Sequence, residues 1–268
     1  MNKEALTKPG APVDEGSLPS SIKAVSMYDP YGWMAKIGLI LPSTNTVNAH
    51  EWGLMAPEGI SIHEARALLT GKSTQDSYDV MAKNTESAAE QLATAEVDIV
   101  AYGCTSGSFM CDRKVIVERL TELAGCPATT TSDSVIAALK TLGAKKIAMA
   151  TPYMDWVNAG EVKFLNDEGF EVVAEMGLGM GESQAERRAI NKIPPQAVFR
   201  MARMVDRPDA EAIFLSCTAM PCINVIADIE AELGKPVVTS NQSTFWNVLR
   251  TLGLNQKIYG FGRLLEEF

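Results

Sequence analysis

Two stretches of the sequence repeat one pattern, in which a short apolar run ends at a small residue followed by Cys-Thr. Residues 98–107 read Asp-Ile-Val-Ala-Tyr-Gly-Cys-Thr-Ser-Gly, and residues 211–220 read Glu-Ala-Ile-Phe-Leu-Ser-Cys-Thr-Ala-Met. Apolar runs of this length predict buried strands. Cys104 and Cys217 therefore mark the ends of two equivalent strands, 113 positions apart in the chain.

The repetition extends over two halves of the chain. Lys36 and Lys146 open equivalent apolar runs at an offset of 110 residues, and residues 139–143 match residues 249–253 at the same offset. Pairs that keep one offset and one order indicate an internal duplication, and this period has the size of a domain. A duplicated α/β unit with one thiol in each half suits chemistry on two sides of a cleft. Two further pairs share the offset, namely Asn48 with Asn158 and Glu51 with Glu161.

Between these landmarks the chain alternates short β-type runs with helical patterns. This alternation predicts parallel sheets with helices on both faces, and ligands bind beyond the carboxyl ends of such strands. We therefore expect an α/β fold of two pseudo-symmetric halves, each with a four-stranded parallel sheet. The expected strands are residues 36–41, 60–64, 97–103, 127–130, 146–151, 170–174, 211–216 and 236–239. The expected helices are residues 45–55, 75–94, 112–124, 132–142, 156–168, 195–206, 222–233 and 243–252.

The same patterns divide the chain into parts. Residues 1–34 are rich in Pro and Gly and lack an apolar period, which indicates an N-terminal arm without a core of its own. We expect the first α/β half at residues 35–144 and the second at residues 145–243, with residues 244–268 joining the first half. The alternating glycines of residues 177–181 predict a flexible loop.

Composition argues against several classes of protein. The 268 residues carry a net charge of −9, which disfavours a general nucleic-acid-binding surface. No apolar run approaches the ~20 residues that span a bilayer, and the N-terminus lacks the pattern of a signal peptide. Five cysteines, an odd number without metal-type spacing, indicate reduced thiols in a cytoplasmic protein.

Each cysteine of the matched pair begins a turn of small and hydroxyl-bearing residues. Thr105 and Ser106 follow Cys104, and Thr218 follows Cys217. Such a turn can direct N–H and O–H groups at an anion, and a thiol at a helix N-terminus has a lowered pKa. An isolated free cysteine is more often a buried apolar residue, but the matching contexts favour a reactive pair. The remaining cysteines have no counterpart and are assigned to packing, namely Cys111, Cys126 and Cys222.

Polar side chains also follow the first strand of each half. Pro42, Ser43 and Asn45 follow one of these strands, and Tyr153 follows the other. Asn45 could donate its carboxamide N–H to a substrate carboxylate, and Tyr153 could donate its hydroxyl. The structural alternatives are a helix N-cap for Asn45 and a half-buried ring with its hydroxyl in water for Tyr153.

Other catalytic classes find little support in the sequence. His50 and His63 lie in dissimilar contexts and form no Ser/His/Asp or Cys/His/Asn set with a repeated partner. No cluster of His, Cys and Asp has the spacing of metal ligands. The first strand is not followed by G-x-G-x-x-G, and no Walker sequence occurs, so we expect no nucleotide cofactor.

Five motifs together resemble one enzyme family. They are Leu-Pro-Ser-Thr-Asn at residues 41–45, Gly-Cys-Thr-Ser at 103–106, Ala-Thr-Pro-Tyr-Met-Asp-Trp-Val-Asn at 150–158, Ser-Cys at 216–217 and Gly-Phe-Gly-Arg-Leu at 260–264. Over residues 35–268 the chain resembles the aspartate/glutamate racemase superfamily. Within that superfamily it is most similar to the branch that contains maleate cis–trans isomerase and arylmalonate decarboxylase.

The resemblance implies two Rossmann-like halves with a cofactor-free active site in the cleft between them. By the maleate isomerase pattern, Cys104 is the nucleophile that adds to an alkene carbon of a small cis-dicarboxylate. Cys217 donates and retrieves a proton on the opposite face, and rotation about the intervening single bond gives the trans isomer. The implied substrate-binding residues are Pro42, Ser43, Asn45, Thr105, Ser106, Tyr153 and Thr218.

Three other functions remain open on the sequence. A racemase or epimerase of an amino acid, a hydantoin or a related acid would also use two thiols, one on each side of a Cα–H. A decarboxylase of the arylmalonate type keeps only the second thiol, as a proton donor, and has Gly-Thr-Ser where this chain has Cys104-Thr105-Ser106. A non-enzymatic binding protein would keep the cleft but have thiol pKa values near ~8.5.

The expected partner is a small carboxylate substrate, without nucleic acid or membrane, and the expected assembly is a homo-oligomer. The sequence does not specify the substrate further, because the pocket residues beyond the carboxylate cradle come from loops. Among residues 175–195, Arg187, Arg188 or Asn191 could enter the site.

Overall fold

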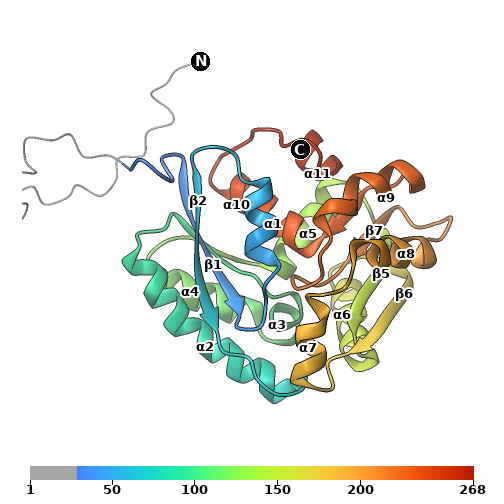
Figure 1. Cartoon of the computed structure of the whole chain (residues 1–268), viewed down its shortest axis with the longest axis horizontal. Coiled ribbons are helices and arrows are strands. Elements are labelled where there is room, and N and C mark those ends of the chain that lie inside the picture. The colour runs from blue at the N-terminus through green and yellow to red at the C-terminus, as the bar shows by residue number, and fades with distance from the viewer. Residues whose placement is uncertain (1–28) are drawn as a thin grey trace, which may run out of the picture.

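Two parallel sheets of four strands, one from each half of the chain, form the frame of the structure (Figure 1). It is a computed structural model that describes residues 29–268, so most of the expected N-terminal arm lies outside the described residues. The first sheet has the order β2-β1-β3-β4 and the second the order β6-β5-β7-β8. The strands of the first sheet are β1 (Ala35–Pro42), β2 (Ile60–Ala67), β3 (Ile99–Tyr102) and β4 (Ala128–Thr130). Those of the second are β5 (Lys146–Tyr153), β6 (Glu171–Met180), β7 (Ala212–Leu215) and β8 (Val237–Thr239).

Helices connect the strands and cover both faces of each sheet (Figure 1). In the first half they are α1 (Asn48–Met55), α2 (Gln75–Thr94), α3 (Thr105–Met110), α4 (Arg113–Ala124) and α5 (Thr131–Thr141). In the second half they are α6 (Asp155–Asp167), α7 (Gln184–Ile190), α8 (Pro195–Val205), the 3-10 helix η3 (Ile223–Val225), α9 (Ile226–Leu233), α10 (Ser240–Thr251) and α11 (Arg263–Glu267). None of the helices within residues 29–268 is long and apolar enough to cross a membrane.

The predicted fold class is confirmed, and the duplication is visible in the topology. Both sheets place the first strand of their half between the second and the third, with all neighbouring pairs parallel. The innermost strands β3 and β7 are buried along their whole length, as expected for strands covered by helices on both faces. Cys104 and Cys217 follow these two strands directly.

The prediction of a flexible loop at residues 177–181 is wrong. β6 continues to Met180, and α7 begins four residues later. Gly177 lies within this strand, at a position where neighbouring groups leave no room for a side chain. A Cβ on Gly177 would lie 2.2 Å from the Asn158 carboxamide nitrogen and 2.6 Å from the Tyr153 carbonyl oxygen. Close approach of neighbouring groups, and not chain flexibility, explains this glycine. The helices α3, α7 and α11 were not expected from the sequence.

The two halves meet through helices as well as through the chain connection. α10, near the C-terminus, packs against α5 and α1 of the first half. The rings of Trp52 and Phe245 lie 5.3 Å apart at this junction, and the Trp52 indole N–H donates to the carbonyl of Asn241. Residues 244–251 thus contact the first half, while the domain boundaries expected from the sequence stay a prediction.

Glu51 links the halves by hydrogen bonds in the interior. This side chain is only 2% exposed, and its Oε1 accepts from the backbone N–H groups of Cys222 (2.7 Å) and Ile223 (3.0 Å). Its Oε2 accepts from the carboxamide of Asn241 at 2.7 Å. A residue of α1 therefore fixes the chain that follows Cys217, and so fixes one thiol relative to the other half.

We predict that Glu51→Ala lowers the free energy of unfolding by about 3 kcal/mol, because it leaves buried N–H donors without an acceptor. Urea denaturation followed by circular dichroism measures this change. The exposed Glu58 serves as the control, since Glu58→Ala should change stability by less than about 0.5 kcal/mol. Equal effects of the two substitutions would contradict the role assigned to Glu51.

Candidate active site

Cys104 lies where β3 passes into α3 and forms the N-cap of that helix. Its side chain is 5% exposed, and its Sγ accepts a hydrogen bond from the Gly107 N–H at 3.3 Å. The Ser106 hydroxyl lies 3.9 Å from the sulfur. A Cβ at position 107 would lie 3.0 Å from the sulfur and 2.3 Å from the Tyr102 hydroxyl, so only glycine fits. The local chain thus brings a helix N-terminus directly onto the thiol.

Cys217 occupies the equivalent position at the end of β7. Its Sγ accepts from the Ala219 N–H at 3.4 Å, and its own N–H donates to the Ser240 hydroxyl at 3.0 Å. The residue is 6% exposed and has a φ of 156°, in a region that L residues rarely adopt. The Tyr153 hydroxyl lowers the pKa of this thiol, so it lies close to the sulfur. The second Cys-Thr turn is therefore held in an unusual backbone conformation by contacts on several sides.

The threonines after the two cysteines reach across the junction. Thr105 donates to the Ser240 hydroxyl at 2.8 Å, which is the same oxygen that accepts the N–H of Cys217. Thr218 donates to the Gly103 carbonyl at 3.1 Å. Ionisation of the Cys104 thiol also acts on the pKa of Cys217, so the two sulfurs lie in one electrostatic environment. The two turns that carry the matched thiols are therefore hydrogen-bonded to each other across the junction of the halves.

Burial governs the protonation of both thiols. It raises the pKa of Cys217 to about 12, against smaller opposing effects of the Tyr153 hydroxyl and the Ala219 N–H. Burial also raises the pKa of the Cys104 thiol, although the N–H of Gly107 lowers it. The lowered pKa expected for Cys104 is therefore wrong, because loss of hydration outweighs the helix N-terminus. The charge of Arg187 also lowers the pKa of Cys104, whereas the main opposing effects at Cys217 come from the neutral Tyr153 hydroxyl and the Ala219 N–H.

Asn45 holds the turn that leads into α1, although the N-cap position itself is Val47, and its contact with a substrate stays a prediction. Its Oδ1 accepts from the N–H groups of Val47 (2.9 Å) and Asn48 (3.1 Å), as an N-terminal cap does. Its Nδ2 donates to the Thr218 hydroxyl at 3.0 Å. One N–H of the carboxamide is thereby used between the halves, and the second remains for a ligand.

Tyr153 is buried, not half-buried with its hydroxyl in water. Its pKa is raised well above the ordinary value by burial and by the neighbouring Cys217 thiol and Glu161 carboxyl. The phenol is therefore a hydrogen-bond donor throughout the neutral pH range. Glu161 lies behind it with its Oε1 accepting from the Ser216 hydroxyl at 2.6 Å, and burial raises the pKa of this carboxyl to about 8.

Pro42 and Ser43 serve the loop that carries Asn45. The Pro42 carbonyl accepts the N–H of Asn45 at 2.9 Å, and the Ser43 hydroxyl accepts the N–H of Leu69 at 3.0 Å. Neither has a described contact with Cys104 or Cys217, so a direct contact with substrate stays a prediction for both.

Sequence reasoning missed Tyr78 and left Arg187 undecided. Tyr78, on α2, is buried, and Ser106 and Cys104 both act on the pKa of its hydroxyl. Arg187, on α7, is 6% exposed, and its Cζ lies 6.0 Å from the centre of the Tyr78 ring. Neither lies at the carboxyl end of a strand, so the rule that located the thiols could not find them. Their signal in the sequence is weak, because a helical Tyr or Arg is usually structural.

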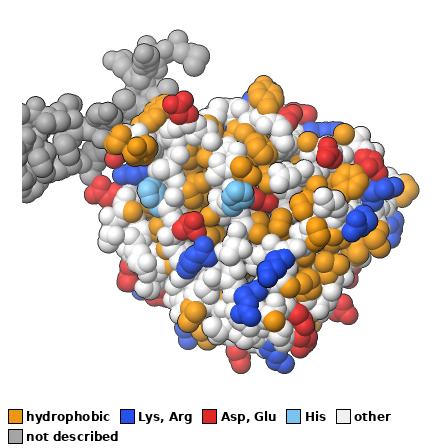
Figure 2. Space-filling view, in the orientation of Figure 1, with side chains coloured by type: hydrophobic (Ala, Val, Ile, Leu, Met, Phe, Trp, Pro, Cys, Tyr) orange, Lys and Arg blue, Asp and Glu red, His pale blue; other side chains and the backbone are white. Residues whose placement is uncertain are grey.

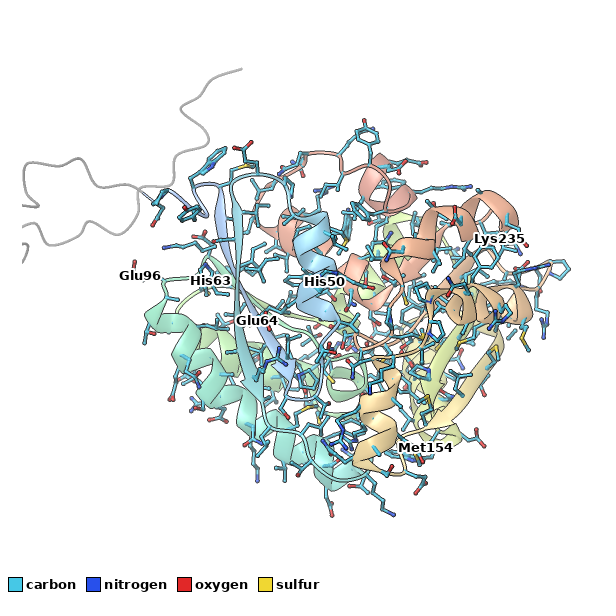
Figure 3. The ribbon with its side chains drawn as sticks, in the orientation of Figure 1. His50, His63, Glu64, Glu96, Met154 and Lys235 are labelled. Carbon is cyan, nitrogen blue, oxygen red and sulfur yellow. The ribbon has the colours of Figure 1, made fainter. Side chains whose placement is uncertain are left out.

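Within residues 29–268, neither histidine has a described contact with Cys104 or Cys217. Figure 3 shows His50 on α1 and His63 on β2, and Figure 2 shows both at the surface of the face that it views. His63 Nε2 is paired with the Ser61 hydroxyl at 2.9 Å. Over residues 29–268, no group of three or more His, Cys, Asp and Glu side chains is arranged to hold a metal ion.

The chain is similar to known proteins over both of its halves, and these proteins belong to two kinds of enzyme. A family model described as arylmalonate decarboxylase matches residues 37–265. Arylmalonate decarboxylase of Bordetella bronchiseptica is 29% identical, with 86% of this chain and 96% of the relative covered. Maleate isomerase of Geobacillus stearothermophilus is 27% identical, with 86% and 97% covered. The crystal structure of the maleate isomerase Iso from Pseudomonas putida S16 has a TM-score of 0.81 at 27% identity, covering 87% of this chain and 98% of that one.

The raised pKa of Glu161 predicts that the stability of the protein depends on pH. Its pKa of about 8 exceeds the ordinary 4.5, so the folded protein keeps a proton that the unfolded chain loses. The resulting stabilisation is complete below about pH 4.5 and is lost as the pH rises through 8. We predict that wild type loses about 3 kcal/mol more than Glu161→Gln between about pH 5 and pH 8, measured by urea denaturation.

Exposed Glu118 in α4 supplies the control for this measurement. Glu118→Gln should follow the wild-type dependence of stability on pH. Parallel curves for wild type and Glu161→Gln would contradict the buried, protonated state assigned to Glu161.

Proposed function

The chain belongs to the arylmalonate decarboxylase family, and from this premise we propose that it is a cofactor-independent cis–trans isomerase of a small cis-dicarboxylate, of the maleate-to-fumarate type. The observation that carries the proposal is the pair of buried thiols, Cys104 and Cys217, one from each half and within electrostatic reach of each other. Two such groups can act on opposite faces of one planar substrate.

The environments of the two thiols support different roles. Burial raises the pKa of Cys104, but the Gly107 N–H and the charge of Arg187 lower it and so favour the thiolate, which is the nucleophilic form. Cys217, with a pKa of about 12, stays protonated at neutral pH and is suited to donate a proton. When the environments of two titratable groups push their pKa values apart, the group with the lower pKa is usually assigned as the base or nucleophile and the other as the acid.

The proposed reaction balances without a further reagent. The Cys104 thiolate adds to one alkene carbon, and the π electrons move to the other carbon and into its carboxylate. Cys217 then donates its proton to that second carbon, which leaves a single bond free to rotate. After rotation the Cys217 thiolate removes the proton, the electron pair re-forms the alkene, and the C–S bond breaks to release the Cys104 thiolate and the trans product.

The groups around the thiols fit two carboxylates. Asn45 keeps one carboxamide N–H for a ligand, and the Tyr153 hydroxyl lies at Cys217. The turns after the cysteines add the N–H and O–H groups of Thr105, Ser106 and Thr218. Donors fixed in a buried site stabilise the negative charge that develops on a carboxylate during thiol addition.

Two other reactions use part of the same site. A decarboxylase would need Cys217 alone and would leave Cys104 without a chemical role. A racemase or epimerase would use both thiols, but it would remove a Cα–H proton and form no C–S bond. The donor groups around the two thiols also support a small carboxylate as the substrate. The homo-oligomeric state and the cytoplasmic location remain predictions from the sequence.

We predict that Cys104→Ser and Cys217→Ser each lower kcat for maleate by at least about 1,000-fold, because each removes a reacting group. Proton NMR in D₂O follows the fumarate signal directly. Cys126→Ser, at a partly exposed cysteine outside the site, should retain wild-type kcat.

The same NMR experiment separates the alternatives. Deuterium entering a Cα without net conversion of an amino acid, or loss of carbon dioxide from a substituted malonate by Cys104→Ser, would replace the isomerase proposal. Full turnover of maleate by both serine variants would also overturn it.

We predict that Tyr153→Phe lowers kcat about 100-fold, because it removes a hydroxyl donor next to Cys217 that acts on the pKa of this thiol. Initial rates at saturating maleate measure the effect, and thermal denaturation checks the fold. Tyr259 is 72% exposed, so Tyr259→Phe is the matched control and should not change kcat. An unchanged kcat in Tyr153→Phe would show that the hydroxyl has no part in the reaction.

A further inference from the structure

Arg187 is a buried cation without a carboxylate partner. Within residues 29–268 its described contacts are the Ser77 hydroxyl, which accepts from Nη2 at 3.1 Å, and the face of the Tyr78 ring. Its Nε is buried and has no hydrogen-bond acceptor. Burial lowers the pKa of the guanidinium, and the groups that raise it again are Tyr78 and Cys104.

α7 carries this guanidinium across the junction to the opposite half. The helix lies over the end of α2 (Figure 1), where the Ser73 N–H donates to the Gly181 carbonyl at 2.8 Å. Asn191, just after α7, accepts from the N–H of Thr46 at 2.9 Å and donates to the carbonyl of Thr44 at 3.1 Å. Both ends of α7 are thus tied to the first half, next to the loop that bears Asn45.

Such a cation needs an anion. A buried charge without a partner is costly, and buried charged groups in proteins are normally paired. The described residues offer Arg187 a hydroxyl, an aromatic ring and the Cys104 thiol, whose pKa burial raises. Its planar fork of N–H donors matches the geometry of a carboxylate, and the unpaired Nε is one prong of that fork.

We propose that Arg187 is a specificity-determining residue that binds one carboxylate of the substrate, the one nearest Cys104, and thereby restricts this enzyme to dianions. The inference rests on the proposed function, since it names the substrate class of the same site. The other carboxylate is left to Asn45, Tyr153 and the turn at Thr218.

A fixed cation at this position also selects among reactions. It repels the ammonium group of an α-amino acid, which disfavours amino-acid racemisation. In a malonate it stabilises the charged carboxylate that decarboxylation would have to discharge as carbon dioxide, which raises the barrier to that reaction. A dianion that keeps both carboxylates through the reaction is the substrate class whose reaction this contact does not slow.

The test uses succinate and its monoamide, succinamate, as unreactive probes of the full-length protein. Isothermal titration calorimetry of wild type should show succinate binding at least about 100-fold more tightly than succinamate, since loss of a buried charge pair has an effect of this order. In Arg187→Met the preference should fall to less than about 5-fold, with succinamate affinity nearly unchanged. Arg187→Lys, which keeps the charge without the planar fork, should retain part of the preference.

Arg188 provides the control, because it is the exposed neighbour on the same helix. Arg188→Met should keep the wild-type preference. Equal binding of the two probes by wild type would overturn the proposal without any variant, and so would an equal loss of affinity for both probes in Arg187→Met. Binding is independent of turnover, so a protein that prefers succinate through Arg187 but does not isomerise maleate would refute only the proposed reaction.

Discussion

The pairing of two Cys-Thr turns across the junction of the halves is the constraint on which the rest of the site depends. Each turn ends an inner, fully buried strand, and each threonine donates to the opposite half, Thr105 to Ser240 and Thr218 to Gly103. Glu51 and the packing of α10 against α1 and α5 hold this arrangement from behind. The thiols are therefore positioned by the two sheets and not by a mobile loop, which suits a reaction that needs groups on both faces of a substrate.

Burial then determines the chemistry. Loss of hydration keeps Cys217 protonated and raises the pKa of Cys104, so neither sulfur is a thiolate by default. Arg187 distinguishes the two, because its charge lowers the pKa of Cys104. The duplication supplied two equivalent thiols, and α7, which has no counterpart in the first half, makes them unequal. Differences between the halves, more than their shared pattern, assign the nucleophile and the acid.

The sequence predicts the fold class and places Cys104 and Cys217 at the carboxyl ends of equivalent strands, because the two halves repeat one pattern. The two strands belong to different sheets, so a site between the halves is predicted only by the family resemblance. The sequence does not predict the net direction of the pKa shift of Cys104, because the helix N-terminus lowers this pKa and the loss of water raises it. Arg187 and Tyr78 could not be found by the same rule, because α7 and α2 bring them in from the side. The glycines of residues 177–181 misled because glycine is also selected by close packing, as at Gly177, and by a positive φ, as at Gly179.

The most direct test of this account is mass spectrometry of Cys217→Ser after rapid acid quench with maleate. This variant lacks the thiolate that removes the proton in the second half of the reaction. An adduct whose second carbon has taken its proton from water should therefore accumulate with the mass of one maleic acid, and peptide mapping should place it on Cys104. An unmodified Cys104 in a variant that binds maleate, or an adduct on another cysteine, would contradict covalent addition by the first thiol. The division of roles between the two halves would then have to be reversed or abandoned.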